Sequence, residues 1–223
     1  MISIIVATDD DLLIGKKDSS NGMPWHNKED SQHFKKTTLH QTILMGKTTY
    51  MAIGRPLPHR KTIVVTRGEL DDERVEVRHD LLETIQEYKN KKEDLFICGG
   101  ASIYKQALPY VDELIISRIP GKHEGETYFP SFDEYNFQLE KETQMESGIM
   151  ESTEEPVVVI EITISEDKYI YENHSIELDA LVKEITTIEG KVIINITDEN
   201  ATQKAYQELI NELDKIHIEY SEK

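Results

Sequence analysis

The sequence feature that most constrains the fold is a short apolar segment followed at once by glycine and by the start of a helix. Residues 95–98 form a buried-type strand followed by Gly99-Gly100 and a helix from Ser102, and residues 42–45 repeat the pattern ahead of Gly46. A helix start presents free N–H groups and the positive end of the helix dipole, and glycine lets the backbone approach a ligand closely. The pattern predicts an α/β protein with an anion-binding turn, although the G-x-G-x-x-G dinucleotide fingerprint is absent.

A second constraint comes from the loop and helix expected over residues 21–36. Gly22 and Pro24 interrupt regular structure before the helix. Asp30 and Phe34 are four residues apart, so they share a helix face that is otherwise apolar or small. A carboxylate turned inward beside an aromatic ring is unfavourable unless it is hydrogen-bonded, and a ligand with paired N–H donors would provide those bonds. The alternative is an N-capping or surface aspartate.

Five blocks of sequence carry a resemblance that covers residues 1–165. They are, in order, Met23-Pro24-Trp25 with Asp30 and Phe34-Lys35, then residues 43–49, 53–60, 97–104 and 125–130. In content, order and spacing the blocks resemble the dihydrofolate reductases. The resemblance implies an α/β domain with an eight-stranded, mostly parallel sheet flanked by helices. It also implies NADPH-dependent reduction of 7,8-dihydrofolate to 5,6,7,8-tetrahydrofolate, which supports one-carbon metabolism and thymidylate synthesis.

The resemblance also implies a set of substrate and catalytic residues. Asp30 would bind the amino group and a ring N–H of the pterin and favour the protonated substrate. Trp25 and Ser117 would help to hold an ordered water and orient the pterin; Ser117 stands where the family typically has threonine. Arg60 would pair with the α-carboxylate of the folate glutamate tail through two parallel hydrogen bonds. The other expected substrate contacts are Ile5, Phe34, Lys35, Ile53, Arg55 and Leu57.

For the cofactor, the resemblance places Lys47 and Arg67 at the 2′-phosphate, which favours NADPH over NADH. Thr48 and Thr49 would meet the pyrophosphate, and residues 16–22 would form a mobile loop that closes over the nicotinamide. In the family a cis peptide usually joins the two glycines at 99 and 100. The remaining expected cofactor contacts are Ala7, Ile14, Gly15, Met23, Gly46, Thr66, Gly99, Gly100, Ala101, Ser102, Ile103, Tyr104 and Glu126.

Composition limits the kinds of binding partner and the cellular compartment that are expected for this chain. The formal net charge is −18, which argues against nucleic acid or anionic lipid and requires a local basic patch for any anionic ligand. The single cysteine, Cys98, excludes an internal disulfide and suits a reducing cytoplasm. No apolar run is long enough to span a bilayer, no signal segment is evident, and no histidines have metal-ligand spacing. We therefore expect a cytoplasmic protein without a metal.

Residues 166–223 have no counterpart in the reductases, and we expect them to form a separate small α/β domain. The predicted β-α-β-α-β order comprises a strand and turn at 169–174, strands at 192–196 and 216–220, and helices at 178–188 and 201–213, the second helix capped by Asp198 or Asn200. The order weakly resembles the soluble domain of the biopolymer-transport proteins. Because no catalytic constellation occurs there, its role stays unassigned, and its edge strand leaves self-association open. Ahead of it, residues 137–142 and 157–164 are expected as the last reductase strands, joined by an acidic loop.

Two other functions fit parts of the sequence. One is a pterin or pyrimidine reductase of related fold; Asp30, Phe34 and Arg60 together argue against it, because a substrate without a glutamate tail has no use for Arg60. The other is a non-catalytic sensor of folate or NADPH, against which the intact site argues. The sequence does not indicate the oligomeric state, the inhibitor sensitivity or the closed conformation of the loop at 16–22.

Overall fold

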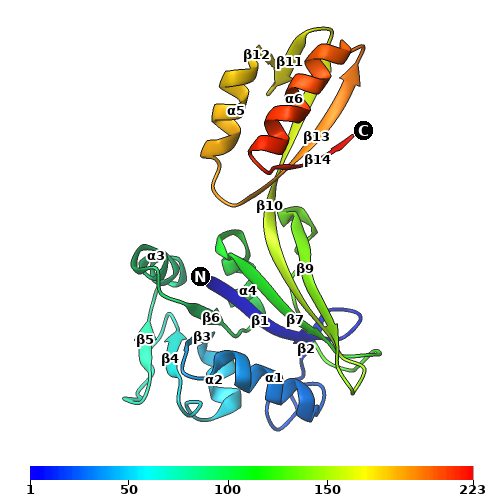
Figure 1. Ribbon diagram of the computed structural model, residues 1–223. Coiled ribbons are helices and arrows are strands. Elements are labelled where there is room, and N and C mark those ends of the chain that lie inside the picture. The colour runs from blue at the N-terminus through cyan, green and yellow to red at the C-terminus, as the bar shows by residue number, and fades with distance from the viewer. Residues whose placement is uncertain (223) are drawn as a thin grey trace. The chain divides into compact units, whose positions relative to one another are not determined.

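The computed structural model describes residues 1–222 and divides the chain into two compact units, Met1–Glu155 and Pro156–Lys223 (Figure 1). The division falls after residue 155 rather than after residue 165. The reason is strand β10 (Met150–Ser165), whose residues 157–165 pair in parallel register with strand β13 (Lys191–Glu199) of the second unit. No helix within residues 1–222 has the length and apolar character needed to cross a membrane.

The first unit is built on a sheet of eight described strands in the order β5-β4-β3-β6-β1-β7-β10-β9. Their bounds are β1 Ile2–Thr8, β3 Thr42–Gly46, β4 Lys61–Val65, β5 Glu76–Arg78, β6 Leu95–Ile97, β7 Glu113–Arg118 and β9 Phe137–Gln144, with β10 as above. Each neighbouring pair from β5 to β7 is parallel, and β7 pairs antiparallel with β10. The eight-stranded, mostly parallel sheet that the sequence predicts is therefore confirmed.

Four helices and a short two-stranded ladder complete this unit (Figure 1). They are α1 Lys28–Thr38, α2 Lys47–Ile53, α3 Leu81–Lys91 and α4 Ala101–Ala107, with β2 Leu13–Gly15 paired to β8 Thr127–Tyr128. The side chain of Asn27 caps α1 by accepting from the backbone N–H groups of Glu29 and Asp30, at 2.9 and 3.1 Å. This cap fixes where α1 begins and so fixes the direction of its first turn.

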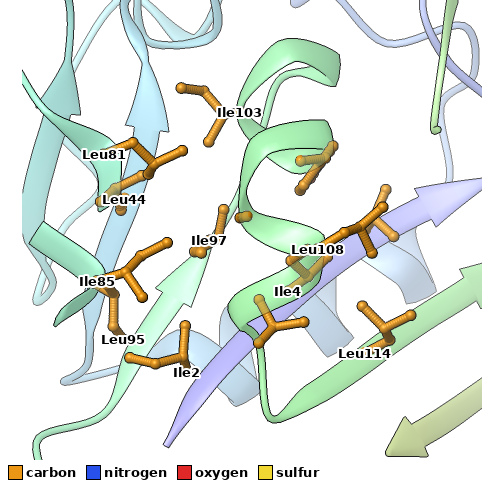
Figure 2. Close-up of a cluster of buried hydrophobic side chains, with 14 of the residues drawn as sticks. Ile2, Ile4, Leu44, Leu81, Ile85, Leu95, Ile97, Ile103, Leu108 and Leu114 are labelled. Atoms are coloured by element: carbon orange, nitrogen blue, oxygen red, sulfur yellow. The ribbon is translucent and has the colours of Figure 1, made fainter. Parts of the chain in front are cut away.

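The core lies on both faces of the central strands, because these strands are apolar along their whole length. On one face, Ile4, Leu44 and Ile97 pack with the apolar sides of α3 and α4, as Figure 2 shows. On the other face, Ile43 and Met45 pack with Tyr50 of α2. The alternation along β3 thus sends Leu44 to one side and its two neighbours to the other, which holds α2 and α4 on opposite faces.

One expectation for this unit is wrong. Residues 151–155 were expected in an acidic loop, but they belong to β10. The physical reason is Arg118 on β7, which donates to Ser152 Oγ at 2.7 Å and to Glu154 Oε1 at 3.0 Å. A cation across the ladder makes a glutamate-rich strand favourable where the sequence alone indicates a loop.

The second unit has a five-stranded sheet of described strands in the order β12-β11-β10-β13-β14, with two helices. The further bounds are β11 Lys168–Tyr171, β12 His174–Ile176, β14 Glu219–Glu222, α5 Leu178–Thr187 and α6 Gln203–Lys215. Ile162, Ile164, Ile194, Leu181 and Leu209 are among the buried residues that join the sheet and both helices into one hydrophobic cluster. This unit therefore has its own core.

Three details of the second unit differ from the sequence expectations. The strand and turn expected at 169–174 lead into a further strand, β12, so that the segment is a hairpin. Thr202, rather than Asp198 or Asn200, caps α6 by accepting from the N–H of Ala205, at 3.2 Å. The final strand is β14 rather than residues 216–220, because Ile216 still ends the helix and His217 has a positive φ of 56°.

Candidate active site

The expected site residues gather where the parallel strands β3, β6 and β1 end and the chain turns into helices or loops. Ile5 and Ala7 lie on β1, and Ala7 stands beside Ser117 of β7 in the parallel register. Carboxyl ends of parallel strands meet at one edge of a sheet, and ligands of α/β proteins bind there. The topology thus brings segments far apart in sequence to a single edge.

Asp30 lies in the first turn of α1, half-buried, one helical turn before Phe34. Burial raises the pKa of its carboxyl, while a hydrogen bond from Ser117 and the positive charge of His33 act in the opposite direction. The net effect is a raised pKa, so burial outweighs the two stabilising contacts. Its partners within the protein do not offset its burial, and an N–H-bearing ligand would supply further ones.

Arg60 lies against α1, the helix that carries Asp30. Its Nη1 donates to Thr38 Oγ1 at 3.0 Å and its Nε donates to the carbonyl of Pro58 at 3.1 Å. The guanidinium carbon lies 5.9 Å from the centre of the Phe34 ring. Burial lowers the pKa of Arg60. These contacts fix the guanidinium beside an aromatic wall.

The other expected substrate residues fall into two groups around this guanidinium. Lys35 and Arg55 are exposed cations. Ile53 and Leu57 are partly buried and pack against the cluster that contains Tyr50. The arrangement therefore offers an apolar wall with positive charge at its outer rim, which suits an aromatic ligand with an anionic tail.

The starts of α2 and α4 lie close together, and we call the turn that they share the cradle. Gly99 and Gly100 are joined by a cis peptide, and the carbonyl of Gly99 accepts from the N–H of Gly46 at 2.8 Å. A Cβ added to Gly100 would lie 3.1 Å from Thr49 Oγ1. Neither helix start has a side-chain cap, so backbone N–H groups remain available for an anion. These features fit the phosphates of a nucleotide cofactor.

Not every residue expected at the cofactor presents its side chain to the cradle. The Tyr104 hydroxyl donates to the carbonyl of Ile5 at 3.0 Å, and its ring contacts Phe129 edge to face. Ile103 is likewise part of the buried core. Ala101 and Ser102 open α4 directly after the glycines. The backbone of this helix start, more than its side chains, faces the cradle.

Cations and hydroxyls lie at the ends of β4 and β5, where the 2′-phosphate was expected. Lys47 Nζ donates to the carbonyl of Glu69 at 2.7 Å, and Arg67 is exposed. Thr66 Oγ1 accepts from the N–H of Gly68 at 3.2 Å, and the Thr66 carbonyl contacts His79 Nδ1 at 2.8 Å. His79 is a neighbour that the sequence analysis did not identify. Thr48, expected at the pyrophosphate, is exposed in the first turn of α2.

The loop expected to cover the nicotinamide is tied to the segment before β8. Glu126 donates its N–H to the Gly15 carbonyl at 3.1 Å and accepts from the N–H of Lys17 at 3.1 Å. A Cβ at Gly125 would overlap the Gly15 carbonyl oxygen, so the close approach requires glycine. Ile14 lies in β2, which pairs with β8 beside these contacts, and Met23 lies beyond the loop.

Trp25 has two neighbours that the sequence analysis missed. Its ring meets that of His123 edge to face at 5.1 Å, and His123 donates its backbone N–H to Asp9 at 2.8 Å. Asp9 is buried and also accepts from the N–H of Leu13 at 2.9 Å. Burial raises the pKa of Asp9, but the backbone donors outweigh it and the net pKa is lowered.

His33 and Glu151 are a second pair that the sequence did not reveal. His33 Nδ1 lies 3.1 Å from Glu151 Oε2. The two residues come from α1 and β10 and are far apart in the chain. Only the pairing of β7 with β10 brings them together.

Together these elements define an α/β enzyme with a phosphate cradle next to a half-buried carboxylate. The family model for dihydrofolate reductase matches residues 1–161, and the chain belongs to that family. The match ends inside β10, so it leaves most of the second unit uncovered.

Individual relatives agree with the family match. The chain is 40% identical over 139 residues to the dihydrofolate reductase of Bacillus subtilis, covering 62% of this chain and 81% of the relative. It is 36% identical over 151 residues to that of Staphylococcus haemolyticus, covering 66% and 86%. Among solved structures, dihydrofolate reductase from Enterococcus faecalis complexed with NADP(H) and RAB-propyl matches with a TM-score of 0.63 and 32% identity, covering 70% of this chain and 96% of that one.

Proposed function

We propose that the site around Asp30 reduces 7,8-dihydrofolate to 5,6,7,8-tetrahydrofolate with NADPH. Membership of the dihydrofolate reductase family and the NADP(H)-bound relative support this activity. The observation that carries the proposal is the half-buried Asp30 carboxylate, which has a raised pKa and lies one turn from Phe34. A carboxylate held in this way is available for paired N–H donors such as those of a pterin.

Within this reaction the chain mainly binds, orients and tunes protonation. Asp30 holds the amino group and a ring N–H of the pterin and favours the substrate protonated at nitrogen 5, which takes its proton from water. Trp25 and Ser117 orient the pterin and help to hold that water. NADPH, when bound, supplies the hydride that reaches carbon 6 of the pterin. Asp30, Trp25 and Ser117 are thus the proposed catalytic residues.

The remaining polar groups select the two ligands. Lys47 and Arg67, with Thr66, are proposed to bind the 2′-phosphate, while Gly100 and Thr49 lie at the pyrophosphate. Arg60 binds the α-carboxylate of the glutamate tail as a fixed guanidinium, supported by its bonds to Thr38 and Pro58. Lys35 and Arg55 add positive charge around the tail.

For the second unit we propose a non-catalytic role, with self-association through a free sheet edge. Support comes from its separate core and from β14, whose partner among residues 1–222 is β13. The similarity of its order of elements to the soluble domain of the biopolymer-transport proteins remains a prediction. A cytoplasmic location is also proposed, on the reducing environment that a lone Cys98 suits.

Steady-state oxidation of NADPH with dihydrofolate tests the central proposal. The wild-type chain is expected to turn over, and Asp30→Asn to lose most activity at pH 7 while remaining folded by circular dichroism. The loss should shrink at low pH, where the substrate protonates without help. Asp179→Asn, an exposed aspartate of α5, is the matched control and should retain full activity. A folded wild-type chain that does not oxidise NADPH with dihydrofolate, or an Asp30→Asn variant as fast as wild type, contradicts the proposal.

A further inference from the structure

We propose that His33 and Glu151 form a positioning pair that orients Asp30 and keeps its carboxylate charged. The inference deepens the proposed function, on which its consequence for turnover rests. It assigns a task to two residues that touch neither ligand in the scheme above.

The geometry closes a ring of four side chains. His33 lies one helical turn after Asp30, so both face the same side of α1. His33 Nδ1 lies 3.1 Å from Glu151 Oε2. Glu151 stands directly opposite Ser117 in the antiparallel pair of β10 and β7, so their side chains share a face. Ser117 in turn hydrogen-bonds Asp30, which closes the ring.

The His33–Glu151 contact is sheltered, which makes it more than a surface ion pair. The side chains are 14% and 23% exposed. The other ring nitrogen, His33 Nε2, is buried without a hydrogen-bond partner. One bond to Glu151 therefore sets the orientation of the ring. Charge interactions at such sites are screened less than on the surface.

The charges around His33 explain the direction of the effect. Asp30 on its own helix and Glu151 on β10 are the two carboxylates beside the imidazole. On α1, Lys36 is exposed, and Glu29 accepts from the backbone N–H of Ser147 at 2.9 Å.

Arg118 of β7 and Glu154 of β10 belong to the opposite face of the sheet. They pair with each other, and strand alternation points both away from Ser117 and Glu151. Glu113, at the other end of β7, shares the face of Ser117 but accepts from Ser3 Oγ at 2.8 Å. On the face shared with Asp30, the positive charge that acts on the carboxylate is that of His33.

The consequence is a shift in the pH range over which the enzyme works. Protonated His33 favours the charged form of Asp30, against the burial that disfavours it. Removing Glu151 frees the ring, so the charge of His33 is no longer held beside Asp30 and the pKa of Asp30 rises. Because the active form has a charged Asp30, the acid limb of kcat/KM moves to higher pH. Above that limb, turnover should change little.

Direct titration of Asp30 tests the pair without requiring turnover. The carboxyl carbons are followed by NMR in ligand-free protein labelled with 13C-aspartate, and Asp30→Asn identifies the resonance. Glu151→Gln and His33→Asn are each expected to raise the midpoint of Asp30 by roughly one pH unit. The double variant should shift no more than the larger single variant, because the pair acts as a unit. Glu151→Asp, which keeps the charge, should restore part of the shift.

Glu154→Gln is the matched control, since it removes a carboxylate and an ion pair from the same strand but on the other face. It is expected to leave the Asp30 midpoint and the acid limb of kcat/KM unchanged, whatever it does to stability. An unchanged Asp30 midpoint in folded Glu151→Gln and His33→Asn, or an equal shift in Glu154→Gln, overturns the proposal. If the midpoint moves but the wild type does not reduce dihydrofolate, the coupling stands and the proposed function fails.

Discussion

At the scale of single residues, Asp30 combines an unfavourable environment with a central place in the site. Its pKa is raised above the ordinary value of 3.8, chiefly by burial. Between that value and the folded pKa, the folded chain binds more protons than the unfolded chain, so the free energy of unfolding falls as pH rises through this window. At neutral pH the full destabilisation is present, and it disappears below pH 3.8.

Asp30→Asn is therefore expected to stabilise the protein at pH 7 while removing activity. The gain should be about 1 kcal/mol, the usual size for relief of an unfavourable functional residue, and it should vanish toward pH 3.5. Urea unfolding of both forms at several pH values measures it. A variant less stable than wild type at pH 7 would show that the contacts of Asp30 with Ser117 and His33 outweigh the cost of its burial.

At the scale of elements, the strand–glycine–helix turn at residues 99–101 leaves little room for a side chain, and a substitution can test this. Gly100 has an ordinary φ of −92°, but a Cβ there would lie 3.1 Å from Thr49 Oγ1. Gly100→Ala should thus fold but fill part of the cradle, raising the KM for NADPH by about tenfold, equivalent to about 1.4 kcal/mol. Gly68→Ala, where a Cβ meets open space, is the control. Equal effects on the KM for NADPH and for dihydrofolate would argue against a cofactor cradle at this turn.

The same elements show which parts of the fold a sequence can predict. The central strands were predicted to within about two residues, because continuous apolar runs between glycines leave few alternatives. The predicted N-cap of α6 was wrong because three nearby residues, Asp198, Asn200 and Thr202, all have side chains that can cap a helix. Only the backbone conformation determines which of them does so. The loop predicted over residues 151–155 was wrong because Glu154 is stabilised in a strand by Arg118, which lies over thirty positions away.

The candidate site likewise contains residues that the sequence could relate to one another and residues that it could not. Asp30 and Phe34 could be related by helix spacing alone, and the family resemblance supplied the expected roles of the other residues. His33 and Glu151 could not be paired from sequence, because their contact depends on the register of β7 with β10. His123 and Asp9 were missed for the same reason. Contacts across a sheet have no local signature, whereas contacts within one helix do.

At the scale of the whole molecule, β10 contributes to both units. Its residues 150–154 pair with β7, and residues 157–165 pair with β13. A truncation after Glu155 should keep turnover per folded molecule within a few-fold of the full chain, since the expected site residues precede it. A truncation after Ser165 leaves an apolar segment without its β13 partner, and it should aggregate more readily.

Turnover, light scattering and sedimentation of the two truncations and the full chain measure both effects. A soluble, folded truncation after Glu155 that loses turnover by orders of magnitude would show that the second unit supplies a catalytic group. If only the full chain sediments as an oligomer, the second unit is the self-association module. Equal solubility of the two truncations would mean that residues 157–165 do not need β13.

The central place of β1 in the sheet also has a consequence during biosynthesis. Ile2 pairs with Leu95, and Thr8 pairs with Arg118, so β1 leaves the ribosome well before either of its neighbouring strands, and the nearer one follows about 90 residues later. At ~5–20 residues per second this delay is about 5–19 s. Throughout it, a mostly apolar strand is exposed in the nascent chain. Recruitment of a chaperone to the emerging β1 segment is therefore the step at which the yield of this protein in the cell should be decided.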